Sequence, residues 1–77
     1  MPTWTVKGID GVKFEIRTRE KGHNVPHVHA HYAGKNVSIA FNGEILAGGI
    51  KKMKQNEAVE WVINNSDMLH KRWEELH

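Results

Sequence analysis

Four of the six histidines of this 77-residue chain lie within nine consecutive residues, the segment HNVPHVHAH at positions 23–31. Histidine is the side chain whose ordinary pKa lies closest to neutral pH, so it serves both as a general acid or base and as the commonest metal ligand. No other segment of the chain is as rich in such groups. Residues 23–31 are therefore the first candidate for a functional site.

From Pro26 onward, this segment predicts a β-strand that separates histidines from apolar residues. Proline cannot donate to a strand ladder, which places Pro26 at the beginning of the strand. Alternate side chains of a strand point to opposite faces of the sheet. One face would carry His27, His29 and His31, and the other would carry Val28, Ala30 and Tyr32.

A metal site is the first of three interpretations of the histidine row. The chain has no cysteine, so the ligands must be His, Asp, Glu or backbone. Histidines at i and i+2 have Cα atoms about 6.5 Å apart and can share an ion, whereas His27 and His31, about 13 Å apart, cannot. A single metal site must therefore use His29 together with either His27 or His31. His23 is the best third ligand, followed by Glu15, and we expect a divalent ion such as zinc at His23, His27 and His29.

Binding of an anion or of nucleic acid is the second interpretation. Arg17 would share the histidine face, arginine binds phosphate through two parallel hydrogen bonds, and histidine stacks on bases. A hydrolase acting on RNA or another phosphodiester could use a histidine pair as general acid and base. The basic residues are few, however, because the net charge is only +2 and Glu15 and Glu20 lie among them.

A structural or interfacial role is the third interpretation. Histidines on a strand can hydrogen-bond to the neighbouring strands. A small sheet with free edges also often completes its core by pairing with a second copy, so that the histidines would lie in a homodimer interface. The residues alone leave the three interpretations open.

The order of predicted elements indicates an α+β fold. Alternating segments at residues 3–7, 12–19, 27–32, 37–41 and 44–47 predict an antiparallel meander of four to five strands, joined by turns at 8–11, 33–36 and Asn42-Gly43. The apolar spacing becomes helical from about Lys52, which predicts a helix beginning there or at Asn56, and a second helix from Asp67 to about Leu76.

The two predicted C-terminal helices should pack on one face of the sheet. We expect contacts between two sets of apolar residues: Trp61, Val62, Leu69 and Trp73 from the helices, and Phe14, Ile16, Val28, Tyr32, Ile39 and Phe41 from the strands. The other face, with the histidine row, would then be exposed to solvent together with Lys13, Glu15, Arg17 and Ser38.

Length and composition predict a single domain over residues 1–77 in the cytoplasm. No run of about 18 apolar residues is present, which excludes a membrane-spanning helix. The first residues lack the pattern of a signal peptide, and the absence of cysteine fits a reducing compartment.

The pattern H-x-x-P-H-x-H at residues 23–29, the Asn-Gly turn, and the spacing W-x(7)-L-x(3)-W at residues 61–73 resemble a small bacterial family, the domain of unknown function four-one-six-zero (DUF4160). The resemblance covers about residues 12–75. This family has no established activity. Its members are often encoded beside another small protein, in an arrangement similar to toxin–antitoxin pairs.

The resemblance implies a bacterial protein that binds a small partner protein encoded nearby, and nucleic acid as well. The residues that match the family pattern are His23, Pro26, His27 and His29. Val25 stands where many members have a first proline, and His31 is additional, so the resemblance assigns it no role.

We therefore expect a small, non-enzymatic binding protein of a toxin–antitoxin-like pair or a similar complex. Its binding residues would be His23, Pro26, His27, His29 and Arg17. A metal-dependent or histidine-based hydrolase acting on RNA or another phosphodiester, with the same histidines, is the alternative.

Overall fold

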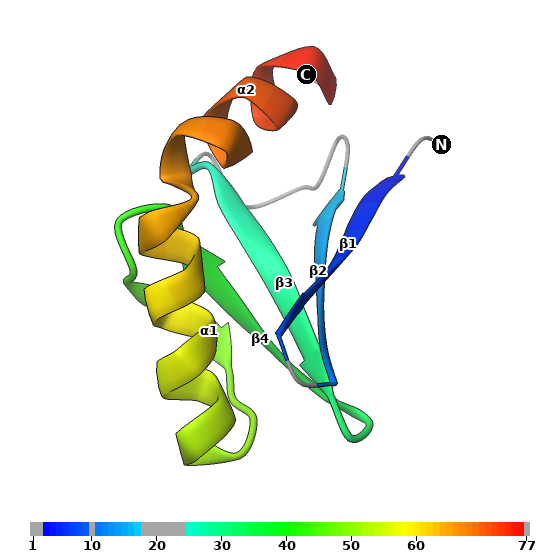
Figure 1. Cartoon of the computed structure of the whole chain (residues 1–77), viewed down its shortest axis with the longest axis vertical. Coiled ribbons are helices and arrows are strands. Elements are labelled where there is room, and N and C mark those ends of the chain that lie inside the picture. Colours follow the sequence, from blue (N-terminus) through cyan, green and yellow to red (C-terminus); the bar gives the residue numbers. More distant parts are fainter. Residues whose placement is uncertain (1–2, 10, 18–24, 77) are drawn as a thin grey trace.

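Five strands precede two helices in the computed structural model, which describes residues 3–9, 11–17 and 25–76 (Figure 1). The strands are β1 (Thr3–Ile9), β2 (Val12–Arg17), β3 (His27–Tyr32), β4 (Lys35–Ala40) and β5 (Ile45–Gly48). The helices are α1 (Lys52–Asn64) and α2 (Ser66–Leu76). This order confirms the predicted α+β class, with five strands.

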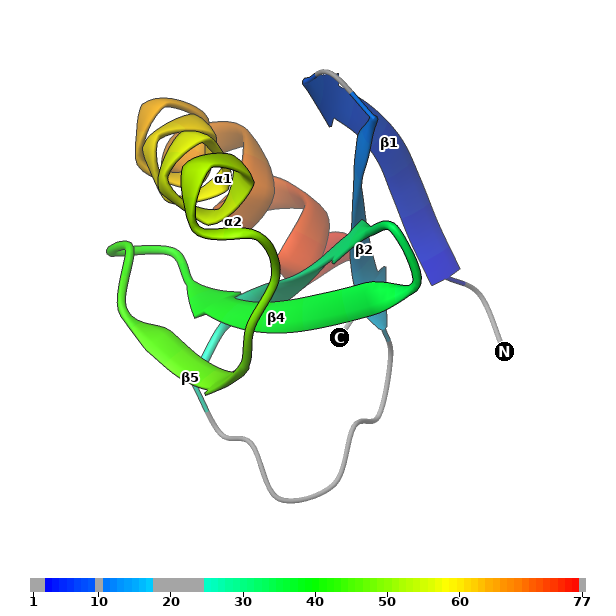
Figure 2. The same cartoon turned by 90° about the horizontal axis from the view of Figure 1, so that it is seen from below.

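The strands form one antiparallel sheet in the order β1-β2-β3-β4-β5, so each strand pairs with its neighbour in sequence. The sheet curls strongly: seen from below, β1 and β2 stand upright while β4 lies across them (Figure 2). Both helices lie on the concave side of this curled sheet, as Figures 1 and 2 show. Neither helix is long and apolar enough to cross a membrane.

The turn between β3 and β4 is tighter than the four residues predicted from the sequence. Tyr32 pairs with Lys35, which leaves only Ala33 and Gly34 in the turn. Their φ angles are +50° and +79°, so both residues occupy the left-handed region that two-residue hairpin turns require. Ala33 takes this conformation although its Cβ makes it unfavourable.

The concave side of the sheet holds the apolar core. The rings of Phe14 on β2 and Trp61 on α1 stack with centroids 4.0 Å apart and 13° between their planes. Ala58, Val62 and Leu69 are fully buried on the helices. The predicted packing of the helices on one sheet face is therefore confirmed, with Tyr32 only partly buried and the other predicted strand residues buried: Phe14, Ile16, Val28, Ile39 and Phe41. Helix α1 begins at Lys52, the first of its two predicted starts.

Candidate functional site

The histidine row lies on β3 as alternation predicts, but its predicted exposure is wrong for two of its three members. The side chains of His27 and His29 are only 1% and 7% exposed, and only His31 is partly accessible. Ser38, opposite His29 on β4, is 5% exposed. Strand β3 is thus buried on both faces at its beginning, and the site cannot be an open row of imidazoles.

Contacts with aromatic residues explain part of the burial of His27. The centroid of the Trp73 ring on α2 lies 5.5 Å from the centroid of the His27 imidazole and 6.1 Å from the centroid of the Phe41 phenyl ring. The imidazole of His29 meets that of His27 edge-on at 5.1 Å. The sequence predicts Trp73 as a core residue, but it gives no sign that the indole reaches His27 at the beginning of β3.

Each of the two buried imidazoles makes a hydrogen bond through its Nδ1. The Nδ1 of His27 lies 2.8 Å from the carbonyl oxygen of Val25, and because a carbonyl only accepts, Nδ1 carries the proton and donates. The Nδ1 of His29 lies 3.2 Å from the Oγ of Ser38. A serine beside a histidine is the arrangement of an activated nucleophile. Here both groups are almost fully buried, which favours a structural polar contact.

The predicted metal site stays a prediction. His23, its proposed third ligand, lies outside the described residues. Among the residues that the structure does describe, no three His, Asp or Glu side chains are grouped to hold an ion. The alternative ligand set of His27, His29 and Glu15 is therefore not assembled either. The bond from His27 to a backbone carbonyl is of the kind that orients metal-ligating histidines, so this residue fits the role. Pro26 directly precedes β3, where the sequence predicted it.

The accessible part of the histidine face is a shallow cleft of about 340 Å³, which we call the polar cleft. It is lined by residues of three neighbouring strands: Thr5 of β1, Lys13, Glu15 and Arg17 of β2, and His31 of β3. Strand pairing brings them together, because Thr5 is opposite Glu15 and Lys13 is opposite His31. Alternation along β2 then places its three charged residues on one face.

Glu15 organises the polar cleft. Its Oε1 accepts hydrogen bonds from the Nε of Arg17 at 2.8 Å and from the Nε2 of His31 at 3.1 Å. Partial burial raises the pKa of Glu15, but the hydrogen bonds from Arg17 and His31, with the positive charge beside them, outweigh burial and hold the pKa below its ordinary value. Glu15 is therefore ionised near neutral pH and balances only one of the two permanent cations, Lys13 and Arg17.

The polar cleft differs from the site predicted from the sequence. Of the predicted binding residues it contains Arg17, while His27 and His29 lie on the same face of β3 but are buried. His31, to which the family resemblance assigned no role, is a lining residue. The sequence signal that could have located the polar cleft was the alternation of charged residues along β2. A strand paired with β2 places the side chains of one of its faces beside these charges.

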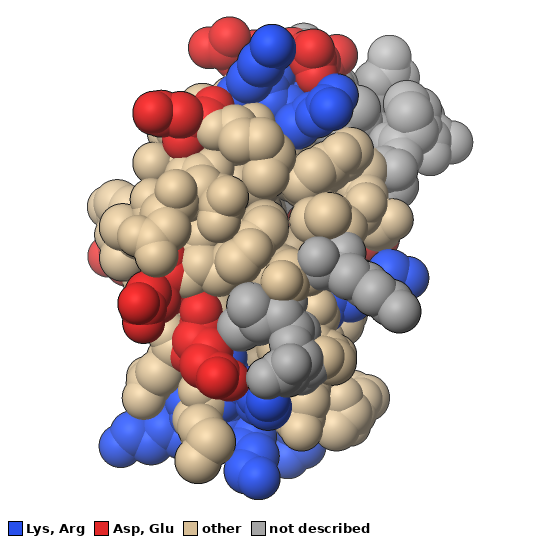
Figure 3. Space-filling model, viewed as in Figure 1, with Lys and Arg blue, Asp and Glu red and all other residues tan. Residues whose placement is uncertain are grey.

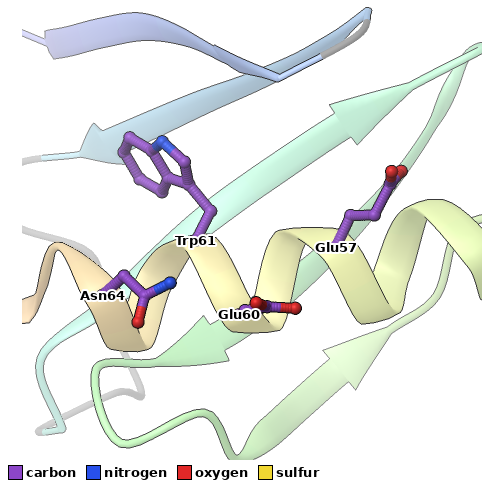
Figure 4. Close-up of a pocket in the computed structure, with 4 residues that line it drawn as sticks. All are labelled: Glu57, Glu60, Trp61 and Asn64. Carbon is purple, nitrogen blue, oxygen red and sulfur yellow. The ribbon is translucent and has the colours of Figure 1, made fainter.

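Two smaller depressions lie elsewhere on the surface. One, of about 230 Å³, is lined by Glu57, Glu60, Trp61 and Asn64 of α1 (Figure 4). In that view the indole of Trp61 turns toward the strands, where it stacks on Phe14, so its main role is in the core. The other, of about 190 Å³, is mostly apolar and is lined by Val25, Pro26, Ala40, Phe41, Asn42 and His70.

Comparison with known proteins identifies one family. The model of the family described as domain of unknown function (DUF4160) matches residues 11–74, which include the polar face of β2, all of β3 and nearly all of both helices. No curated protein and no solved structure matches the chain.

Proposed function

This chain belongs to the DUF4160 family, and we propose that it is a non-enzymatic binding protein that acts in a complex with a small partner protein, as in toxin–antitoxin pairs. The observation that supports this proposal is the polar cleft, where charged side chains of β2 and β3 lie accessible on one sheet face. We place this complex in the cytoplasm of a bacterium.

The ligand that best fits the polar cleft is an acidic side chain of the partner. Lys13 and Arg17 carry two positive charges, and Glu15 compensates one of them. The hydrogen bonds of Glu15 fix the Arg17 guanidinium and the His31 ring before the partner arrives, which lowers the entropy cost of binding. The buried pair of His27 and His29 supports β3 from within.

The hydrolase alternative requires His27 or His29 to reach a phosphodiester. Side chains that are 1% and 7% exposed do not offer an imidazole nitrogen to a large substrate, and this observation favours the binding role. Two measurements test the alternative. The first determines the metal content of protein purified without a nickel column and then titrates wild type and His29→Ala with zinc. The second compares the degradation of RNA by wild type and His29→Gln.

The binding role is tested with the protein encoded next to this chain. Both proteins are co-expressed, the complex is captured through a tag on the partner, and the Kd is measured by titration calorimetry. We expect Lys13→Glu, which reverses a charge in the polar cleft, to weaken binding about tenfold or more. Lys71→Glu is the matched control, because it makes the same charge change at an exposed position of α2 and should leave the Kd unchanged.

Three results would overturn the proposal. The first is the absence of any complex with the neighbouring protein. The second is RNA cleavage, or stoichiometric zinc, that depends on His29. The third is a homodimer of this chain that Lys13→Glu dissociates, because the polar cleft would then bind a second copy instead of a different protein.

A further inference from the structure

A second charged surface lies at the end of the molecule where α1 begins and β3 turns into β4. Four lysines gather there: Lys35 of β4, Lys51 immediately before α1, and Lys52 and Lys54 in its first turn. Figure 3 shows a group of Lys and Arg side chains at this lower end without acidic ones among them, whereas the basic side chains at the upper end lie beside acidic ones. We call these four lysines the basic end.

Tyr32 connects the two parts of the basic end. It pairs with Lys35 across the β3–β4 turn, and its partly exposed ring lies 5.7 Å from the Nζ of Lys54. Lys54 is further held by Glu57, whose Oε2 is 3.5 Å from the same Nζ. The segments that carry the lysines, although distant in sequence, therefore form one surface.

Three of the four lysines are available to a ligand. Lys35, Lys51 and Lys52 are exposed, and within the part of the chain that the structure describes no carboxylate pairs with them. With Glu57 counted, the basic end carries a charge of +3, whereas the whole chain carries +2. The remaining Lys, Arg, Asp and Glu residues of the chain therefore sum to −1, so the basic end accounts for the net positive charge.

Helix stability does not explain lysines at this position. The amino end of a helix carries a partial positive charge, so cations there are unfavourable and acidic residues are preferred. The first turn of α1 has no acidic residue, and Lys51 at its N-cap makes no side-chain capping bond. The lysines therefore oppose the helix dipole, and α1 gains no dipole stabilisation from them.

We propose that the basic end binds the phosphate backbone of duplex nucleic acid. Its lysines are spread over a surface, which suits the rows of phosphates on a duplex better than one small anion. A protein partner fits less well, because interfaces are depleted in lysine and rich in apolar contacts, and residues 51–54 expose only one large apolar side chain, Met53. The proposal is independent of the polar cleft and of its partner.

The test is fluorescence anisotropy of a labelled 20-base-pair DNA duplex, titrated with the full chain at several salt concentrations, and the same titration with duplex RNA. Contacts of three lysines with phosphates predict a slope of log K against log salt of about −2.7, which is roughly a 40-fold loss of affinity between 50 and 200 mM salt. We expect Lys52→Glu to weaken binding about tenfold at low salt, and the matched control Lys71→Glu on α2 to have little effect. A preference for DNA or RNA identifies the physiological duplex.

Loss of binding in Lys52→Glu would not be explained by unfolding, because the substitution places an acidic residue where the helix dipole favours one and should not lower the melting temperature. The proposal is overturned if neither duplex binds at 50 mM salt. It is also overturned if Lys71→Glu weakens binding as much as Lys52→Glu. Equal affinity for a polyglutamate peptide of matched charge would assign the basic end to an acidic protein instead.

Discussion

Glu15 shows how one residue can set the chemistry of a small surface. Its carboxylate holds Arg17 and His31 on the same sheet face, and these bonds join two residues on one face of β2 to a residue of β3. A carboxylate that receives two hydrogen bonds is stabilised in its ionised form. The polar cleft therefore depends on Glu15 for its geometry as well as for its charge.

The lowered pKa of Glu15 predicts a pH-dependent contribution to stability. Because the pKa is lower in the folded protein than in the unfolded chain, the contribution is present above the unfolded value of about 4.3 and is lost as pH falls through the folded value. We expect Glu15→Gln to lower the free energy of unfolding by about 1 kcal/mol at pH 7, and this difference from wild type to shrink below pH 4.3. Urea unfolding at several pH values measures it.

Glu60→Gln is the control for this experiment, because Glu60 is an exposed residue of α1 and its substitution should change stability by less than about 0.5 kcal/mol. A difference between Glu15→Gln and wild type that stays constant from pH 7 to pH 3 would contradict the role assigned to the carboxylate.

Ser38 contributes to stability through a hydrogen bond among the buried residues. Its Oγ is within hydrogen-bond distance of the Nδ1 of His29, and both side chains are nearly inaccessible. Loss of one partner of a buried hydrogen bond costs about 1–2 kcal/mol, so we expect Ser38→Ala to lower the free energy of unfolding by that amount. Asn36→Ala, at an exposed position of the same strand, should change it far less. Equal effects of the two substitutions in urea unfolding would show that the buried contact contributes no stability.

At the scale of elements, the β3–β4 hairpin contains an unfavourable residue that can be improved. Ala33 has φ of +50°, a conformation that costs a residue with a Cβ about 1 kcal/mol and glycine nothing. We expect Ala33→Asn, which tolerates this region, to raise the melting temperature by a few degrees, and Gly34→Ala to lower it. Thermal unfolding followed by circular dichroism measures both. A lower melting temperature for Ala33→Asn would contradict the turn geometry.

The sequence predicts individual elements better than it predicts what covers them. Alternation in β2 and β3 correctly separates the two faces of each strand, because this property is local to the chain. The exposure of a side chain, in contrast, depends on distant parts of the chain. The helices cover the apolar face as predicted, yet His27 on the opposite face of β3 is also buried, in contact with Trp73 of α2. Only the curl of the sheet and the course of α2 bring these two residues together, and no pattern in either segment encodes that contact.

At the scale of the whole molecule, α2 connects the apolar core to the end of the sheet where β3 begins and β4 ends. Trp73 contacts Phe41, directly after β4, and His27 at the beginning of β3. These two positions lie close together because His27 pairs with Ala40. Phe41 in turn meets the ring of His70 at 4.7 Å, so α2 is held at this end of the sheet by several aromatic contacts.

These contacts predict that the accessibility of His27 depends on α2. We expect diethyl pyrocarbonate to modify the exposed His70 readily in the wild-type protein and His27 very slowly, as read by peptide mass spectrometry. Trp73→Ala should remove the indole cover and raise the modification rate of His27 about tenfold or more, with His70 as internal standard. Trp61→Ala is the matched control, because it removes an indole of similar size that stacks on Phe14 instead. Equal rates at His27 in the two folded variants would show that the burial of this imidazole does not depend on Trp73.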